Sequence, residues 1–171
     1  MIILQTAGGD DASGVAGFAG SLFGTDAGFQ ATTFRSNDYI HRLNRTLQTE
    51  LRAVCAYQAV RPGVKAIDCD HAVEEHQYSA RQIVRLVVAN RGIPEDHAPL
   101  TTSLTTTVFR LCGALPTSMG QVATISALVT LEKSLFDSYS KLLDQAPPAD
   151  AELLDLLAKR TGRRIEGLRG L

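Results

Sequence analysis

Three ionisable side chains occupy positions that a helical apolar pattern reserves for hydrophobic residues. They are Glu50, His76 and Glu132, and each is flanked by apolar residues at helical spacings of three or four. Glu50, for example, lies between Leu47 and Val54 in a series that is otherwise apolar. Each of the three is therefore predicted to point from its own helix into a buried core.

These residue types together have the chemistry of a metal site. A buried carboxylate without a partner is costly, so three converging ionisable groups need a compensating interaction. Carboxylate oxygens and imidazole nitrogens are ligands for iron, manganese or zinc, and helix bundles build such sites from facing helices. We expect Glu50, His76 and Glu132 to share one layer, with Glu75, one position away from the apolar pattern, flanking it as a fourth ligand.

A second interpretation of the same layer needs no metal. Arg160 and Arg164 fall at a comparable height on the last predicted helix. Either residue could form a buried salt bridge with Glu132 or Glu50, while His76 forms hydrogen bonds within the polar layer. A guanidinium in that position would repel a metal ion. The sequence leaves both interpretations open.

Other reactive side chains carry weaker patterns. Tyr78 and Tyr139 are predicted to be core aromatics whose hydroxyl groups reach the polar layer. The other three histidines have no consistent partner spacing and are expected at the surface: His41, His71 and His97. The three cysteines lie far apart without a Cys-x-x-Cys pair, so the sequence indicates neither a disulfide framework nor a thiolate zinc site.

Two helices are predicted in the first half of the chain. The first runs from residue 36 to a break at residues 61–63, Arg-Pro-Gly, because proline lacks an amide donor and glycine accepts turn conformations. The second begins between Val64 and Asp70 and ends at residues 90–94, where Gly92 and Pro94 provide a stop signal.

Two further helices follow a long connection. Residues 94–118 contain three prolines and a predicted short helix over about residues 100–112. Ser118 and Gln121 supply a capping box for a third helix, which runs to about Gln145. Two prolines precede a fourth helix that opens near Asp150, and the pattern is weaker beyond Gly162.

The core-facing stripes of the last two helices can also be predicted. The stripe of the third helix reads Val122, Ile125, Val129, Glu132, Phe136, Tyr139 and Leu143, and that of the fourth contains Leu153, Leu154, Leu156 and Leu157. Short loops make sequential helices antiparallel neighbours, whereas the long connection can return the chain along the bundle. We therefore expect an all-α four-helix bundle of two antiparallel hairpins joined by a long crossover.

Residues 1–35 differ from the rest of the chain. They hold seven of the fourteen glycines, have no Lys or Arg before Arg35, and show neither helical nor strand periodicity. This segment is predicted to be a Gly/Ala-rich N-terminal arm, with the bundle over residues 36–171. Its four phenylalanines leave open whether the arm packs on the body, packs on a second subunit, or is a flexible linker.

Composition narrows the classes of function. A chain of 171 residues with 44% hydrophobic and 20% charged residues fits one domain with a sizeable core. Its 17 basic and 18 acidic side chains give a net charge of -1, so no electrostatic footprint for nucleic acid or an anionic membrane is present. Without a membrane-spanning apolar run or a signal-peptide pattern, we expect a cytoplasmic protein.

Three segments carry a resemblance to a known superfamily. Residues 43–57 (LNRTLQTELRAVCAY) resemble the first helix of bacterioferritin-type, ferritin-like proteins. Residues 74–78 (EEHQY), continuing to residues 92–94, resemble the second helix and its exit. Residues 131–139 (LEKSLFDSY) are similar to the third helix of small bacterial ferritin-like proteins of unknown function. The similarity extends over about residues 36–162.

The resemblance implies a ferritin-like fold in which Glu50 matches the first iron-ligating glutamate. Metal sites of this superfamily generally use Glu-x-x-His pairs on the second and fourth helices. Here the second-helix pair is Glu75-x-x-Tyr78, with the histidine at position 76, and the nearest fourth-helix fragment is Glu166-x-x-Arg169. The resemblance therefore implies the fold and a degenerate metal site.

Three hypotheses of function follow from these patterns. The first is a ferritin-like bundle of non-enzymatic or undetermined role that acts through its surface and self-associates, most simply as a dimer, with Glu50, His76 and Glu132 as a buried polar layer. The second is an iron- or manganese-dependent carboxylate oxidoreductase or metal-handling protein that uses Glu50, His76 and Glu132. The third is a bundle whose centre binds a small apolar ligand. No substrate can be identified from the sequence.

Overall fold

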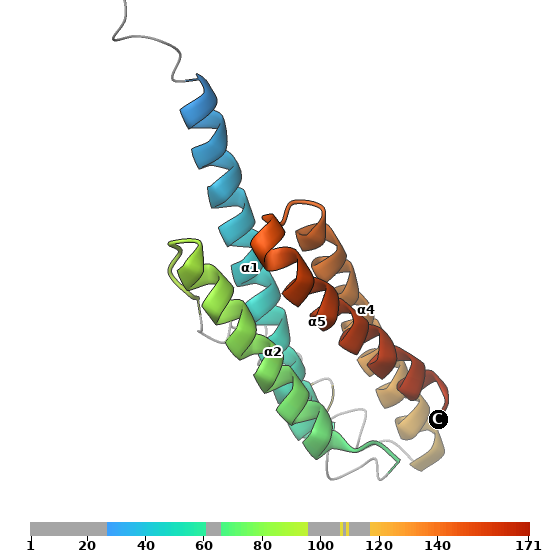
Figure 1. Cartoon of the computed structure of the whole chain (residues 1–171). Helices are drawn as coiled ribbons and strands as arrows, with labels where there is room; N and C mark the ends of the chain where they lie inside the picture. Colours follow the sequence, from blue (N-terminus) through green and yellow to red (C-terminus); the bar gives the residue numbers. More distant parts are fainter. Residues whose placement is uncertain (1–26, 61–65, 96–106, 108, 110–116) are drawn as a thin grey trace, which may run out of the picture. The chain divides into compact units, whose positions relative to one another are not determined.

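The computed structural model describes residues 27–60, 66–95, 107, 109 and 117–171, and the side chains of residues 27–36, 117 and 118 lie outside the description. Within these ranges the chain forms four helices and no strand: α1 (Ala27–Val60), α2 (Cys69–Ala89), α4 (Thr117–Leu143) and α5 (Pro148–Arg169) (Figure 1). The prediction of an all-α four-helix architecture is confirmed for the described part of the chain.

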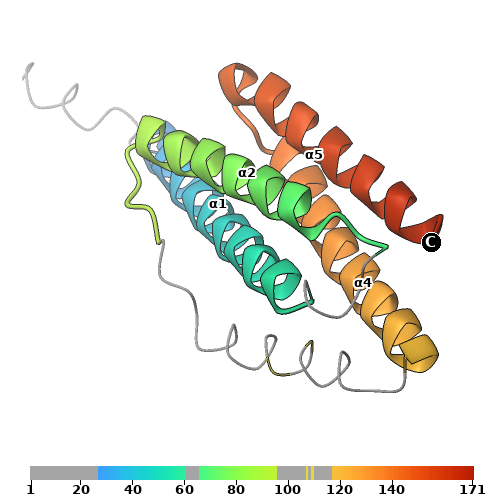
Figure 2. The ribbon, with the colours of Figure 1, turned by 90° about the horizontal axis from the view of Figure 1, so that it is seen from below.

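The chain divides into two compact units, Met1–Phe34 and Arg35–Leu171. Within the second unit, α1 and α2 lie side by side and antiparallel, and so do α4 and α5 (Figures 1 and 2). Short turns connect the helices of the second pair, since α4 ends at Leu143 and α5 begins at Pro148. These two pairs bring four apolar faces together.

Two apolar clusters form the core of this second unit. The larger cluster contains Leu43 and Leu47 of α1, Ile83 and Val87 of α2, Leu135, Tyr139 and Leu142 of α4, and Leu154 and Leu157 of α5. The smaller cluster contains Tyr57 and Val60 of α1, Cys69 and Ala72 of α2, Leu128 of α4, Leu168 of α5 and Phe109. Along α2 and α4, His76 and Glu132 fall between residues of the two clusters, and along α1 Glu50 lies near their boundary, between Leu47 and Ala53. The two clusters therefore enclose a polar layer.

The first helix is longer than predicted. It begins at Ala27, nine residues before the predicted start at Ser36, so its first turns fall in the segment predicted as an irregular arm. Residues 27–35 contain no proline and only one glycine, and helix propagation needs no apolar stripe once a helix has formed. The predicted short helix over residues 100–112 lies outside the described residues apart from 107 and 109, which are both helical.

The predicted stripe of α4 is wrong in register at several positions. The buried residues are Gly120, Thr124, Leu128, Glu132, Leu135, Tyr139 and Leu142, whereas Val122 is 69% and Phe136 39% exposed. Apolar residues lie on both candidate stripes, so periodicity alone could not choose between them. The stripe that contains Gly120 and Thr124 is the buried one.

The fourth helix extends beyond its predicted weak point. It continues through Gly162 to Arg169, and its buried face includes Thr161, Ile165 and Leu168. Packing of this face offsets the propensity cost of glycine, about 1 kcal/mol relative to alanine. Leu156, predicted as a core residue, is 39% exposed because it lies on the opposite side from Leu154 and Leu157. No helix in the described ranges is long and apolar enough to cross a membrane.

Candidate functional site

Glu50, His76 and Glu132 meet in the polar layer between the two apolar clusters. His76 lies at its centre: its Nδ1 atom is 2.6 Å from Oε2 of Glu50, and its Nε2 atom is 3.0 Å from Oε1 of Glu132. All three side chains are fully buried. The structure thus brings together three of the four predicted site residues, each from a different helix.

A fourth helix contributes a guanidinium to this layer. Arg164 of α5 donates from Nε to both carboxylate oxygens of Glu132, at 3.1 and 3.2 Å. Its second terminal nitrogen donates to Oγ1 of Thr161 at 3.1 Å, one turn earlier on the same helix. The sequence left open whether Arg160 or Arg164 forms the buried salt bridge, and in the structure Arg164 forms it.

Glu75, the fourth predicted site residue, lies at the rim of the layer. Its side chain is 24% exposed and accepts from the guanidinium of Arg164 at 3.4 Å. It is also 4.0 Å from Nε2 of the exposed His71, one turn earlier on α2. Among the described residues of the layer, Glu75 thus pairs with Arg164.

Two tyrosines complete the layer, and only one of them was predicted there. The hydroxyl of Tyr139 donates to Oε1 of Glu50, as expected. The hydroxyl of Tyr57 donates to Oε1 of Glu132 at 2.9 Å, and its ring centroid is 5.2 Å from that of His76. The sequence did not single out Tyr57 for the layer, because periodicity identifies the face of a residue but not the partner of its hydroxyl.

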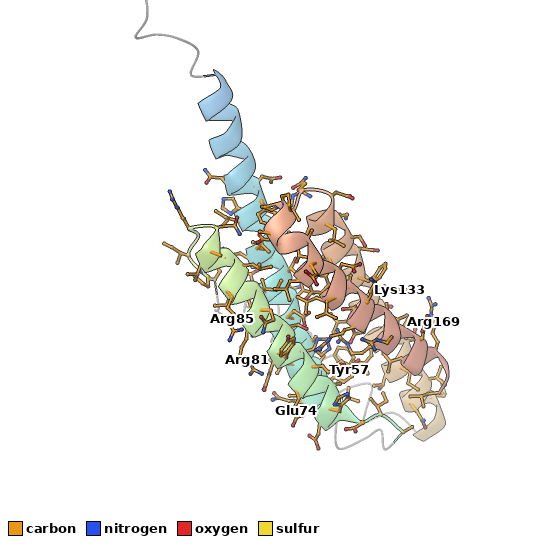
Figure 3. The ribbon with its side chains drawn as sticks, in the orientation of Figure 1. Tyr57, Glu74, Arg81, Arg85, Lys133 and Arg169 are labelled. Atoms are coloured by element: carbon orange, nitrogen blue, oxygen red, sulfur yellow. The ribbon has the colours of Figure 1, made fainter. Side chains whose placement is uncertain are left out.

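The other predicted tyrosine does not reach the layer. Tyr78 lies between α2 and α5 with the guanidinium of Arg160 above its ring, 4.6 Å from the centroid. This cation–π contact holds Arg160 outside the bundle. Figure 3 shows Tyr57 between the helices, whereas Glu74, Arg81 and Arg85 point outward from α2.

The charges of the layer support one another. Burial opposes charge on His76, but the carboxylate of Glu50 and hydrogen bonds with Glu132 and Glu50 outweigh it, so the pKa of His76 is raised. Burial likewise opposes charge on Glu132, yet its contacts with His76, Arg164 and Tyr57 keep its pKa below the ordinary value. Two buried carboxylates thus face one imidazolium and one guanidinium.

The same surroundings hold the tyrosines in their neutral forms. Burial, followed by the nearby charge of Glu132, raises the pKa of Tyr57. Burial and the charge of Glu50 raise the pKa of Tyr139. For Arg164, burial is outweighed by Glu132 and the other carboxylates, which raise its pKa. The tyrosines therefore act in this layer as hydrogen-bond donors.

The geometry does not fit a metal ion as the side chains stand. Both ring nitrogens of His76 are hydrogen-bonded to carboxylate oxygens, so neither offers a free lone pair to a cation. The guanidinium of Arg164 already occupies the position beside Glu132 in which a cation would be favoured. Among the described residues, no group of three or more His, Cys, Asp or Glu side chains is arranged to hold a metal ion.

A second polar cluster, where α2 ends and α5 begins, was not predicted. Asp150 is buried and accepts from the hydroxyl of Tyr39 at 3.0 Å and from Nδ2 of Asn90 at 2.9 Å. It connects α1, the end of α2 and the start of α5. The sequence presented Asp150 and Asn90 only as helix-end residues, and such residues are usually exposed.

The fold and the site define an all-α four-helix bundle with a buried, charge-balanced layer. Comparison with protein-family models, with curated proteins and with solved structures found no match.

Proposed function

We propose that this protein is a ferritin-like four-helix bundle that works without a metal ion and without catalysis of its own, acting in the cytoplasm through its surface. In this proposal, the helix pairs α1–α2 and α4–α5 are the two hairpins of a single-crossover bundle. The buried layer serves to fix how the four helices pack together.

One observation carries the proposal: the guanidinium of Arg164 stands where a metal ion would otherwise balance the carboxylates. It donates to both oxygens of Glu132 and reaches Glu75, while His76 bridges Glu132 and Glu50. Each ligand-type side chain is therefore satisfied by another side chain. A divalent cation would have to break several of these contacts and would lie beside a buried positive charge.

A metal titration of two arginine variants tests this proposal. We expect the melting temperature of the unaltered protein to be insensitive to Zn²⁺, Mn²⁺ and Fe²⁺ and to EDTA. Arg164→Ala removes the guanidinium that Glu132 and Glu75 share, so its melting temperature should be lower and should rise with added metal. Arg160→Ala is the matched control, because Arg160 lies over Tyr78 outside the layer. Metal-dependent stability of the unaltered protein would contradict the proposal.

The alternative function, a di-metal oxidoreductase or metal-handling protein, rests on a different observation. Three ligand-type side chains from three helices converge within hydrogen-bonding distance. For this function Arg164 would have to swing out of the layer when metal enters. Stoichiometric metal in the unaltered protein, lost in Glu50→Ala, would favour this alternative.

We also propose that the protein self-associates as a dimer. Met119 and Val122 lie one turn apart on α4 and are 70% and 69% exposed. Large apolar side chains at this exposure are candidates for a contact with a second subunit. Sedimentation velocity of a Val122→Asp variant should then show a smaller species than the unaltered protein, whereas an unchanged distribution would exclude this face.

A further inference from the structure

Two hollows on the surface lie on either side of the Glu75–Arg164 ion pair. The first, which we call the apolar pocket, has a volume of about 210 Å³ and is lined mainly by Tyr57, Ile67, Ala72, Gly167, Leu168 and Leu171. The second, the arginine groove, has a volume of about 710 Å³ and lies between α2 and α5. Both are also lined by His71, Glu75 and Arg164, so they adjoin one another.

The apolar pocket has open space along its α5 wall. A Cβ atom built on Gly167 would meet nothing within 4 Å. Leu171, another lining residue, is 57% exposed, so apolar surface is available there. An apolar cavity of about 150 Å³ can hold benzene, so this pocket is large enough for a short hydrocarbon chain.

The arginine groove supplies positive charge next to that pocket. Arg160, Arg163 and Arg164 all line it from α5. Arg160 is held by its contact with the ring of Tyr78, and neither Arg160 nor Arg163 has an ion pair among the described residues. These two guanidiniums can therefore donate to an anionic group.

Acidic residues of the groove do not cancel this charge. Glu75 is already paired with Arg164 and His71. Glu74 lines the groove from α2, across from the arginines, and is exposed. An anion on the α5 side therefore meets two uncompensated guanidiniums, while an apolar group attached to it reaches the pocket beside Gly167.

We propose that the apolar pocket and the arginine groove form one binding site for a small amphipathic carboxylate, with its hydrocarbon chain in the pocket and its carboxylate on Arg160 and Arg163. Arginine favours this role because its planar guanidinium binds carboxylates through two parallel hydrogen bonds. This site adjoins the buried layer through Tyr57, Glu75 and Arg164 but does not rest on the metal-free function proposed above.

Isothermal titration calorimetry of the full chain with octanoate tests the site. We expect saturable binding to the unaltered protein, with octan-1-ol binding at least about tenfold more weakly because it lacks the charge that the arginines bind. Gly167→Leu should weaken octanoate binding at least about tenfold by filling the pocket, since its Cβ meets no neighbour and the helix should tolerate it. The double variant Arg160→Ala/Arg163→Ala should weaken it to a similar extent.

Two variants of the same helix serve as controls. Gly170→Leu adds the same side chain and Arg169→Ala removes one arginine charge from the same helix, and neither residue lines the pocket or the groove. Both should bind octanoate as the unaltered protein does. The absence of octanoate binding, or equal binding by Gly167→Leu and the unaltered protein, would overturn the proposal.

Discussion

His76 is the residue on which the buried layer depends most directly, because it contacts carboxylates from two other helices. The type and spacing of Glu50, His76 and Glu132 were enough to predict their meeting, since a charged residue within an apolar stripe is a strong departure from the pattern. The choice of Arg164 over Arg160 was not predictable. The two lie four residues apart on one face of α5, and the ring of Tyr78 decides which of them stays outside.

The raised pKa of His76 predicts how stability depends on pH. A raised folded-state pKa means that the imidazolium contributes stability fully below the unfolded pKa, about 6.5, and loses it as the pH rises through the folded pKa. We therefore expect the free energy of unfolding to fall as the pH rises above about 6.5. Urea denaturation over a pH series measures this slope. A His76→Gln variant with the same slope would show that another group is responsible.

The lowered pKa of Glu132 predicts a second loss of stability in acid. Its carboxylate contributes stability fully above the unfolded pKa, about 4.3, and this contribution is lost as the pH falls through the lower folded pKa. Glu132→Gln should flatten the acid limb of the same pH series. Glu152→Gln, an exposed change on α5, is the control and should leave that limb unchanged.

Removing Arg164 should be strongly destabilising in the absence of metal. Glu132 is fully buried, and losing one partner of a buried pair typically costs about 3 to 5 kcal/mol. Arg160→Ala, which loses only a partly exposed cation–π contact, should cost about 1 kcal/mol or less. Guanidinium denaturation measures both. Equal effects of the two substitutions would mean that the side chain of Arg164 is not a necessary part of the layer.

At the scale of whole elements, periodicity predicted which segments are helical better than it predicted which face of each helix is buried. On α4 two stripes compete, and the buried one contains Gly120 and Thr124 rather than Val122. Apolar residues lie on both of these stripes, so periodicity along a single helix could not choose between them. The Tyr39–Asp150–Asn90 cluster was missed for a related reason, since helix-end polar residues look exposed until three helices are placed together.

Asp150 should contribute much more to stability than an ordinary surface aspartate of the same helix. Asp150→Ala removes the acceptor of the Tyr39 hydroxyl and one of the two acceptors of Asn90 Nδ2, and leaving the buried Tyr39 donor without a partner costs about 1 to 3 kcal/mol. Asp155→Ala breaks only an exposed pair with Lys159 and should cost about 0.5 kcal/mol or less. Thermal unfolding of the two variants separates these outcomes, and comparable losses would refute the structural role of the cluster.

The end of α2 offers a substitution that should stabilise the protein. Arg91 has a φ of 61°, and the amides of Arg91 and Gly92 donate to the carbonyls of Val88 and Val87, the hydrogen-bond pattern of a Schellman motif. An L-residue in this conformation is strained, so Arg91→Gly should raise the free energy of unfolding by about 0.5 to 1 kcal/mol.

The adjacent glycine should behave in the opposite way. A Cβ atom on Gly92 would lie 2.6 Å from Cγ2 of Ile40, so Gly92→Ala should be destabilising. Urea denaturation of both variants checks the pair. A gain in stability from Gly92→Ala would mean that α1 and the end of α2 are not packed as described.

At the scale of the whole molecule, the four helices surround a layer with the residue types of a metal centre and the contacts of a salt-bridge network. The sequence left these interpretations open because ligand-type residues are the same in both. What separates them is the position of one guanidinium, which depends on how α5 packs against α2 and α4. We propose that the buried carboxylates of Glu50 and Glu132 are neutralised by His76 and Arg164 of the same chain and not by a metal ion.

The most direct test is the metal content of untagged protein expressed with added iron, manganese and zinc, measured by inductively coupled plasma mass spectrometry. The proposal predicts far less than one metal ion per chain, with no difference between the unaltered protein and Glu50→Ala. Stoichiometric metal that is lost in Glu50→Ala would contradict it and would identify the layer as a metal centre.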